Sequence, residues 1–248
     1  MTKKYGVLFL KGMAMGAADV VPGVSGGTIA FITNIYATLI HALSQFNIRA
    51  VHLLLKGQFK DFWSHINGTF LAVLFAGVFT SVLSLAALLS HTLETYPIHL
   101  WSFFFGLVFA SIFIVGKQVS QWKGSTILSF AIGTVLAYWI TTLPASSGSD
   151  SYAYLILCGA LAICAMILPG ISGSFILLLL GAYATVIEAI ATRDIGMIAA
   201  VGFGAIIGLL SFTKLLKWVF EKYNDLTVAL LSGFLLGSLN KIWPWKEV

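Results

Sequence analysis

A short motif that occurs twice limits the folds open to this chain more than any other feature. The pattern Pro-Gly-x-Ser-Gly stands at residues 22–26 and again at 169–173, an offset of 147. Aligned without gaps, segments 22–42 and 169–189 share 10 identical residues in 21 positions. Self-similarity over this distance is typical of a chain built from two related halves.

The similarity continues beyond the motif at a shorter spacing. Gly77 and Gly106 correspond to Gly204 and Gly233 at an offset of 127. The 20-residue difference between the two offsets corresponds to a stretch after the first motif that the second half lacks. We therefore predict a single integral membrane domain over 1–248, with repeat one at about 6–116, a linking span at about 126–143 and repeat two at about 152–243.

Composition places these repeats in a membrane. Hydrophobic residues make up 59% of the chain and charged residues 9%, whereas soluble domains carry about 25% charged residues. The 14 basic residues form no basic face, which argues against nucleic-acid binding. The predicted apolar segments are 6–21, 27–44, 69–90, 99–116, 126–143, 152–168, 175–190, 196–213 and 227–243.

Each motif interrupts an apolar segment that is too short to cross a bilayer alone. Proline lacks a backbone donor and glycine permits unusual dihedral angles, so each motif should break a helix. The arm at 7–20 would make a helix of about 21 Å, against a hydrocarbon core of about 30 Å. We predict a re-entrant helical hairpin at each motif, with the Pro-Gly-x-Ser-Gly tip inside the membrane. A kinked single span is the alternative.

Three predicted spans separate the two hairpins, and this odd number predicts inverted topology for the two repeats. The fold class is therefore an all-α polytopic membrane protein with two inverted repeats. If the N-terminus is cytoplasmic, 11 of the 14 basic residues lie inside, as the positive-inside rule predicts for a multi-pass membrane protein. Lys11 interrupts the first apolar run, so we interpret the N-terminus as retained and not as a signal peptide.

The stretch 45–67 mixes aromatic and aliphatic residues with Arg49, Lys56 and Lys60. It is too charged to span and too apolar to be free in water, so an interfacial amphipathic helix is predicted, with an ordinary ordered loop as the alternative. Cys158 and Cys164 lie in one apolar segment and are interpreted as small core residues without a disulfide.

Paired helix breaks in inverted repeats point to a transporter binding site near the midplane of the membrane. A broken helix exposes N–H groups and the positive end of its dipole, which attract anions such as phosphate. Alternatively, the motifs only shape tight tips and the lysines extend to the interface. The candidate substrate-binding residues are Ser25, Gly26, Gly27, Thr28, Ser172, Gly173, Ser174, Lys11 and Lys214.

Two carboxylates inside apolar segments are candidates for ion coupling. Asp19 lies three residues before Pro22, and Glu188 lies in the second arm of the second hairpin. Intramembrane carboxylates suggest a proton or ion relay, so H⁺ or Na⁺ coupling is predicted for both. The sequence contains no nucleotide-binding motif and no metal-ligand spacing, so we expect no cofactor and no bound metal.

The motif also permits an enzymatic interpretation. Gly23-x-Ser25-x-Gly27 matches the nucleophile-elbow pattern of serine hydrolases. Such a serine needs a nearby histidine base, and none of the five histidines lies in the middle of a later span. We therefore predict a transporter and not an enzyme, with an intramembrane serine hydrolase and a carrier or channel for a small soluble anion as alternatives.

Segments 12–28 and 168–174 together resemble the PopT family of bacterial polyprenyl-phosphate translocases. The resemblance extends over essentially the whole chain. It implies transport of undecaprenyl phosphate, the lipid carrier of peptidoglycan and other cell-envelope polymers, back across the cytoplasmic membrane for recycling. Family members often carry glutamate after the hairpin tyrosine, where this chain has Ala37 and Ala184, so no role for that glutamate is carried over.

Residue chemistry and resemblance agree on an anionic lipid substrate. We expect the two tips to meet near the midplane and to hold the phosphate head group through their N–H groups and hydroxyls. The prenyl tail would stay in the lipid through a lateral opening. Alternating access would follow from the movement of one repeat against the other.

Overall fold

The computed structural model describes residues 2–21 and 23–245, so Pro22 of the first motif lies outside the described residues. All regular elements of the described residues are helical, which confirms the all-α prediction. They are α1 (Thr2–Val20), α2 (Gly26–Ile32), α3 (Tyr36–Ser44), α4 (Ile48–Leu55), α5 (Phe59–His65), α6 (Gly68–Thr95), α7 (Pro97–Gly116), α8 (Gly124–Thr142), α9 (Tyr152–Ile167), α10 (Gly173–Leu179), α11 (Tyr183–Thr192), α12 (Ile195–Lys222), α13 (Asn224–Ser238) and the 3-10 helix η1 (Leu239–Ile242).

Several of these helices are long and apolar enough to cross a bilayer. Five candidate spans lie in α6, α7, α8, α12 and the pair formed by α13 and η1. The bent pairs α2–α3 and α10–α11 bring the number to seven if each counts as one span. The chain is therefore a multi-pass membrane protein. Helices α6 and α12 continue past the predicted ends at 90 and 213, because the charged and polar residues that follow the apolar segments do not break either helix.

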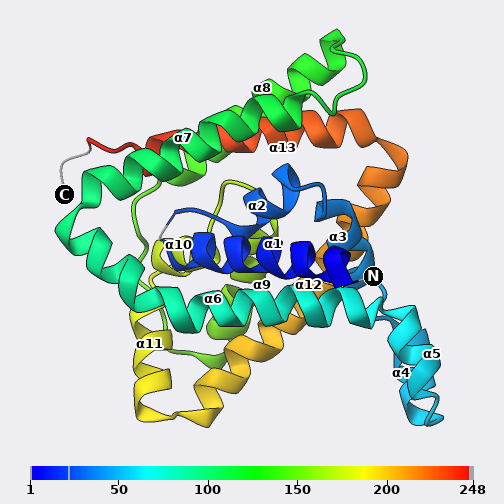
Figure 1. The fold of residues 1–248 in the computed structure, drawn as a ribbon. Coiled ribbons are helices and arrows are strands. Elements are labelled where there is room, and N and C mark those ends of the chain that lie inside the picture. The colour runs from blue at the N-terminus through cyan, green and yellow to red at the C-terminus, as the bar shows by residue number, and fades with distance from the viewer. Residues whose placement is uncertain (1, 22, 246–248) are drawn as a thin grey trace.

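The two halves repeat the same helices at the same offsets. Adding 147 to the bounds of α2 gives the bounds of α10, and adding 127 to the bounds of α6 gives those of α12. Helices α4 and α5 occupy the extra stretch of the first half. Figure 1 shows the N-terminus, α4 and α5 at one end of the molecule and α11 at the other. With α6, α7 and α8 between the hairpins, this arrangement is consistent with inverted repeats.

Close glycine contacts join the first helix of each half to the 28-residue helix that follows its hairpin. In the first half, Gly12 of α1 meets the Leu74 carbonyl of α6, and Gly77 of α6 meets the Phe9 carbonyl of α1. The corresponding contacts of the second half join α9 to α12 and are Gly159 with Val201, and Gly204 with Ile156. Because each position lacks a side chain, the two backbones approach closely. The duplication therefore preserves packing as well as sequence.

The second arm of each hairpin is broken, which the sequence analysis did not predict. Helices α2 and α3 are bent by 117°, and α10 and α11 by 108°. Asn34 and Gly181 stand at equivalent positions in these bends, with φ of 57° and 67°. Left-handed backbone ends an α-helix, so the predicted segments 27–44 and 175–190 each consist of two short helices.

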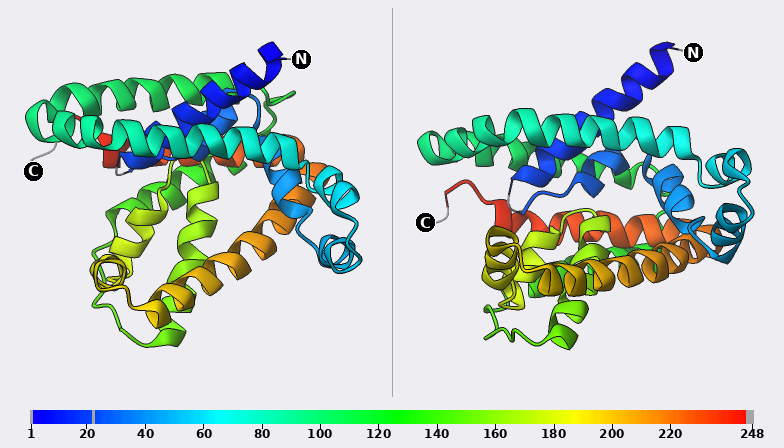
Figure 2. Two further views of the ribbon diagram at one scale, coloured as in Figure 1. Left: turned by 60° about the horizontal axis from the view of Figure 1, so that its bottom comes forward. Right: turned by 90° about the horizontal axis from the view of Figure 1, so that it is seen from below.

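The stretch 45–67 also differs from the prediction of one amphipathic helix. It consists of α4 and α5, which pack on each other and are separated at Gly57, whose φ is 69°. Large apolar side chains remain exposed on this pair, including Ile48 at 88% and Leu55 at 82%. The pair projects from the helical body (Figure 2), and its exposed apolar surface fits a position at a membrane interface.

Candidate functional site

The two hairpin tips have the same backbone conformation. Gly23 and Gly170 hold the equivalent left-handed position, with φ of 86° and 89°, which glycine adopts without steric cost. Ser25 and Ser172 are extended and cap α2 and α10, where each hydroxyl accepts an N–H from the first turn of its helix. The residues of each motif therefore give the two tips the same backbone conformation.

The tips are hydrogen-bonded to each other. The Ser25 hydroxyl lies 3.1 Å from the Met166 carbonyl and 3.3 Å from the Leu168 carbonyl, which share its single proton. The Gly170 N–H donates to the Thr28 Oγ1 at 3.1 Å. Ser25 and Thr28 are 1% and 0% exposed. The polar groups of the first tip are thus satisfied by the second, and the contact between the halves is closed in this conformation.

Asp19 is part of the first tip. Its carboxylate accepts the N–H of Gly26 at 2.7 Å, and a Cβ on Gly26 would collide with the same carboxylate. A Cβ on Gly27 would lie 2.7 Å from the Ile167 carbonyl of the other half. Glycine is therefore required at both positions. At Gly26 the Asp19 carboxylate of the same tip lies too close for a Cβ, and at Gly27 the backbone of the other half does.

The second tip reaches the surface. Its two hydroxyls, on Ser172 and Ser174, are 2.7 Å apart. Ser172 and Gly173 are buried, whereas Ser174 is exposed. The second tip is therefore exposed at Ser174, whereas residues 23–28 of the first tip are buried.

Lys241, which is not among the substrate-binding candidates from the sequence, lies beside both tips. The Nζ of Lys241, in η1, lies 4.6 Å from the centre of the Phe175 ring, which follows the second tip. A Cβ on Gly23 of the first tip would lie 3.4 Å from the Lys241 Cγ. Nothing in the sequence around Lys241 indicates contact with either motif, because the nearer motif ends 68 residues before it.

The other sequence candidates are dispersed. Lys11 donates to the Thr33 carbonyl at 2.7 Å, at the C-terminal end of α2. Lys214 is exposed on α12 and lines a cavity of about 330 Å³ with Glu221. Glu188 is exposed on α11. Among the described residues, neither Lys214 nor Glu188 has a side-chain hydrogen bond or ion pair with a tip residue.

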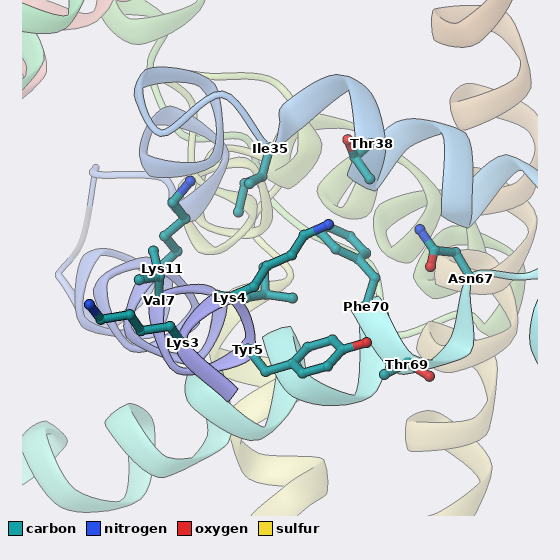
Figure 3. Close-up of a pocket in the computed structure, with 11 residues that line it drawn as sticks. Lys3, Lys4, Tyr5, Val7, Lys11, Ile35, Thr38, Asn67, Thr69 and Phe70 are labelled. Atoms are coloured by element: carbon teal, nitrogen blue, oxygen red, sulfur yellow. The ribbon is translucent and has the colours of Figure 1, made fainter. Parts of the chain in front are cut away.

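A cavity of about 680 Å³ lies beside α1, near the N-terminal end of the molecule. Figure 3 shows Lys3, Lys4 and Lys11 around it, together with the apolar side chains of Ile35 and Phe70. Three amines beside apolar walls suit a ligand with an anionic group next to a hydrocarbon chain, because lysine binds phosphate as a compact positive charge.

Comparisons with known proteins agree with this chemistry. A family model described as undecaprenyl phosphate translocase-like matches residues 15–248. A polyprenyl-phosphate transporter of Vibrio cholerae serotype O1 is 49% identical over 246 residues, covering 99% of this chain and 80% of the relative. A polyprenyl-phosphate transporter of Staphylococcus aureus is 32% identical over 255 residues, covering 95% of this chain and 85% of the relative. No solved structure matches the chain.

Proposed function

The chain belongs to the undecaprenyl phosphate translocase-like family, and from this membership and the geometry of the tips we propose that it transports undecaprenyl phosphate across the bacterial cytoplasmic membrane. The observation that carries the mechanism is the hydrogen-bonded contact between the two tips. In this proposal the contact is a gate, and its polar groups hold the phosphate when the gate opens.

The charge of the substrate makes such a gate necessary. A phosphate monoester carries about −1.5 to −2 charges at pH 7. Moving it bare through hydrocarbon would be prohibitive, because a buried charge needs partners. The hydroxyls of Ser25, Thr28, Ser172 and Ser174 supply such partners. In the closed state the buried hydroxyls bond to protein groups, so they remain satisfied whether or not substrate is present.

The lysine-lined cavity supplies a place for the head group on the N-terminal side. With the N-terminus in the cytoplasm, Lys3, Lys4 and Lys11 attract the phosphate toward the inner leaflet when the tips separate. The prenyl tail stays in the lipid. Movement of one repeat against the other then exposes the tips to each side in turn.

Asp19 is the proposed coupling residue. Its carboxylate holds the N–H of Gly26 directly at the gate, so a change in its charge would alter the tip itself. Binding of H⁺ or Na⁺ at Asp19 would therefore bias opening of the gate. Glu188, which is exposed on α11, is at most a secondary contributor in this proposal.

Reconstitution in liposomes that contain undecaprenyl phosphate tests the proposal. A membrane-impermeant phosphatase reports the lipid in the outer leaflet over time. We expect fast exchange with wild-type protein and loss of exchange in the Ser25→Ala/Ser172→Ala variant. The matched control is Ser111→Ala/Ser232→Ala, which removes two buried hydroxyls that bond only within their own helices.

The result that overturns the proposal is folded wild-type protein that moves no lipid, with or without a pH or Na⁺ gradient. Uptake of inorganic phosphate by the same vesicles would then assign the chain to transport of a small soluble anion. Equal loss of exchange in the tip variant and the control variant would refute the assignment of the head group to the tips.

A further inference from the structure

A row of aromatic rings runs along the outside of α7. Phe105 and Phe109 are stacked with ring centres 6.2 Å apart, and Phe109 meets Phe113 edge-on at 5.3 Å. Trp243, directly after η1, meets Phe105 edge-on at 5.3 Å. The four-residue spacing places the three phenylalanines on one face of the helix. The row therefore joins the C-terminal segment to the length of α7.

Apart from the contact of Phe105 with Trp243, this face of α7 is largely exposed, whereas its counterpart in the other half is covered. Phe109, Phe113 and Trp243 are 46%, 59% and 44% exposed. A Cβ on Gly106 would meet nothing within 4 Å, whereas the equivalent Gly233 of α13 packs against the Phe130 carbonyl of α8. Helix α8 thus covers α13 and leaves the matching surface of α7 open.

Both ends of the row lead to features that suit a lipid phosphate. At one end, Phe113 lines an apolar cavity of about 500 Å³ with Trp122 and Phe130. At the other end, Trp243 follows two residues after Lys241, whose amine lies over the Phe175 ring beside the tips. Figure 2 shows the red C-terminal segment next to the first hairpin.

We propose that the rings of Trp243, Phe105, Phe109 and Phe113 bind the isoprenoid chain of a polyprenyl phosphate while Lys241 holds its phosphate at the tips. This inference rests on the proposed function and adds a second head-group position, on the opposite side of the gate from the lysine-lined cavity.

Charge and shape complementarity select this occupant over others. Lys241 is half-buried, and the contact of its amine with the Phe175 ring holds it at the second tip, next to the exposed residue Ser174. Flat ring faces suit the planar, methyl-branched units of an isoprenoid chain, which make extensive dispersion contacts with them. A ligand with one anionic end and a long unsaturated tail matches both parts of the site.

Binding of two probes by purified protein in detergent separates the two parts of the site. The probes are undecaprenyl phosphate and undecaprenol, which share the chain and differ in the phosphate. We expect Lys241→Gln to weaken undecaprenyl phosphate binding by roughly tenfold or more and to leave undecaprenol binding unchanged. Lys241→Arg should restore binding of the phosphate. Phe109→Ala should weaken both probes.

Two control variants carry the same chemistry elsewhere. Lys222→Gln removes a lysine that also stacks on aromatic rings, and Phe79→Ala removes an exposed phenylalanine of α6. Unchanged binding in Lys241→Gln, or equal losses in Lys241→Gln and Lys222→Gln, would refute the head-group position. Equal losses in Phe109→Ala and Phe79→Ala would refute the tail track.

The outcomes also separate this inference from the proposed function. Wild-type protein that transports undecaprenyl phosphate while Lys241→Gln binds it normally would overturn only the inference. A change in the mass of the protein on Phe109→Ala, measured by light scattering, would show that a second copy of the chain covers α7 and would overturn the tail track.

Discussion

Replacing Thr28 by valine tests whether the contact between the tips is a gate. The Gly170 N–H donates to the Thr28 hydroxyl at 3.1 Å, and Thr28 is 0% exposed. Valine keeps the shape of threonine but removes the acceptor, which leaves a buried N–H unpaired in the closed state. Such a loss costs about 1–3 kcal/mol. If opening restores a partner to this N–H, the equilibrium constant for opening should rise by about 5-fold to 150-fold.

Hydrogen exchange at the Gly170 amide measures this equilibrium. Pro169 has no N–H, so the Gly170 amide is the next to exchange after that of Leu168, which donates to the Cys164 carbonyl. We expect faster exchange there in Thr28→Val and wild-type exchange in Thr213→Val. The control also removes a fully buried hydroxyl, but that hydroxyl bonds to the Leu209 carbonyl of its own helix. Unchanged exchange at Gly170 in Thr28→Val would refute the reasoning, as would an equal increase in the control.

Three further predictions concern packing, coupling and charge. Gly204→Ala should lower the free energy of unfolding by about 1–3 kcal/mol, because its Cβ meets the Ile156 carbonyl. Gly202→Ala on the same helix places its Cβ in open space and is the control. Equal melting temperatures for the two variants would contradict this prediction. Asp19→Asn keeps an acceptor for the Gly26 N–H but removes the charge, so the protein should still fold. Its lipid exchange should no longer respond to a pH or Na⁺ gradient. A response like that of wild type would argue against coupling at Asp19. Lys3→Gln/Lys4→Gln should slow lipid exchange more at low ionic strength than at high ionic strength, because salt screens exposed charges. The same slowing at both ionic strengths would show that the lysine-lined cavity does not attract the phosphate.

Local sequence signals predicted much of this fold. Apolar segments located the long helices, and the two offsets match the bounds of α2 with α10 and of α6 with α12. The motifs predicted breaks at the correct places because proline and glycine act on their immediate backbone neighbours. Gly57 indicates the separation of α4 and α5, but the prediction of one helix was based on the amphipathic character of the whole stretch, which does not reveal a break within it.

The contacts between the tips could not be read from the sequence. The Ser25 hydroxyl bonds to carbonyls 141 and 143 residues away, and those carbonyls belong to main chain whose residue type carries no information. The position of Lys241 could not be predicted for the same reason, because it depends on the packing of η1 beside both hairpins. Periodicity and spacing report neighbours along the chain, whereas these contacts depend on how the two halves pack.

The meeting of the two tips has an electrical consequence. Where water reaches the tips from both sides, most of the transmembrane voltage falls across the thin layer that the tips form. Moving one elementary charge through 100 mV corresponds to about 2.3 kcal/mol, so a phosphate with −1.5 to −2 charges experiences about 3.5–4.6 kcal/mol. In a cell that is negative inside, this force drives the lipid phosphate outward. In the proposed transport, cations that cross with the lipid offset this cost of its return to the cytoplasm, and the number of cations per lipid determines whether transport generates a current.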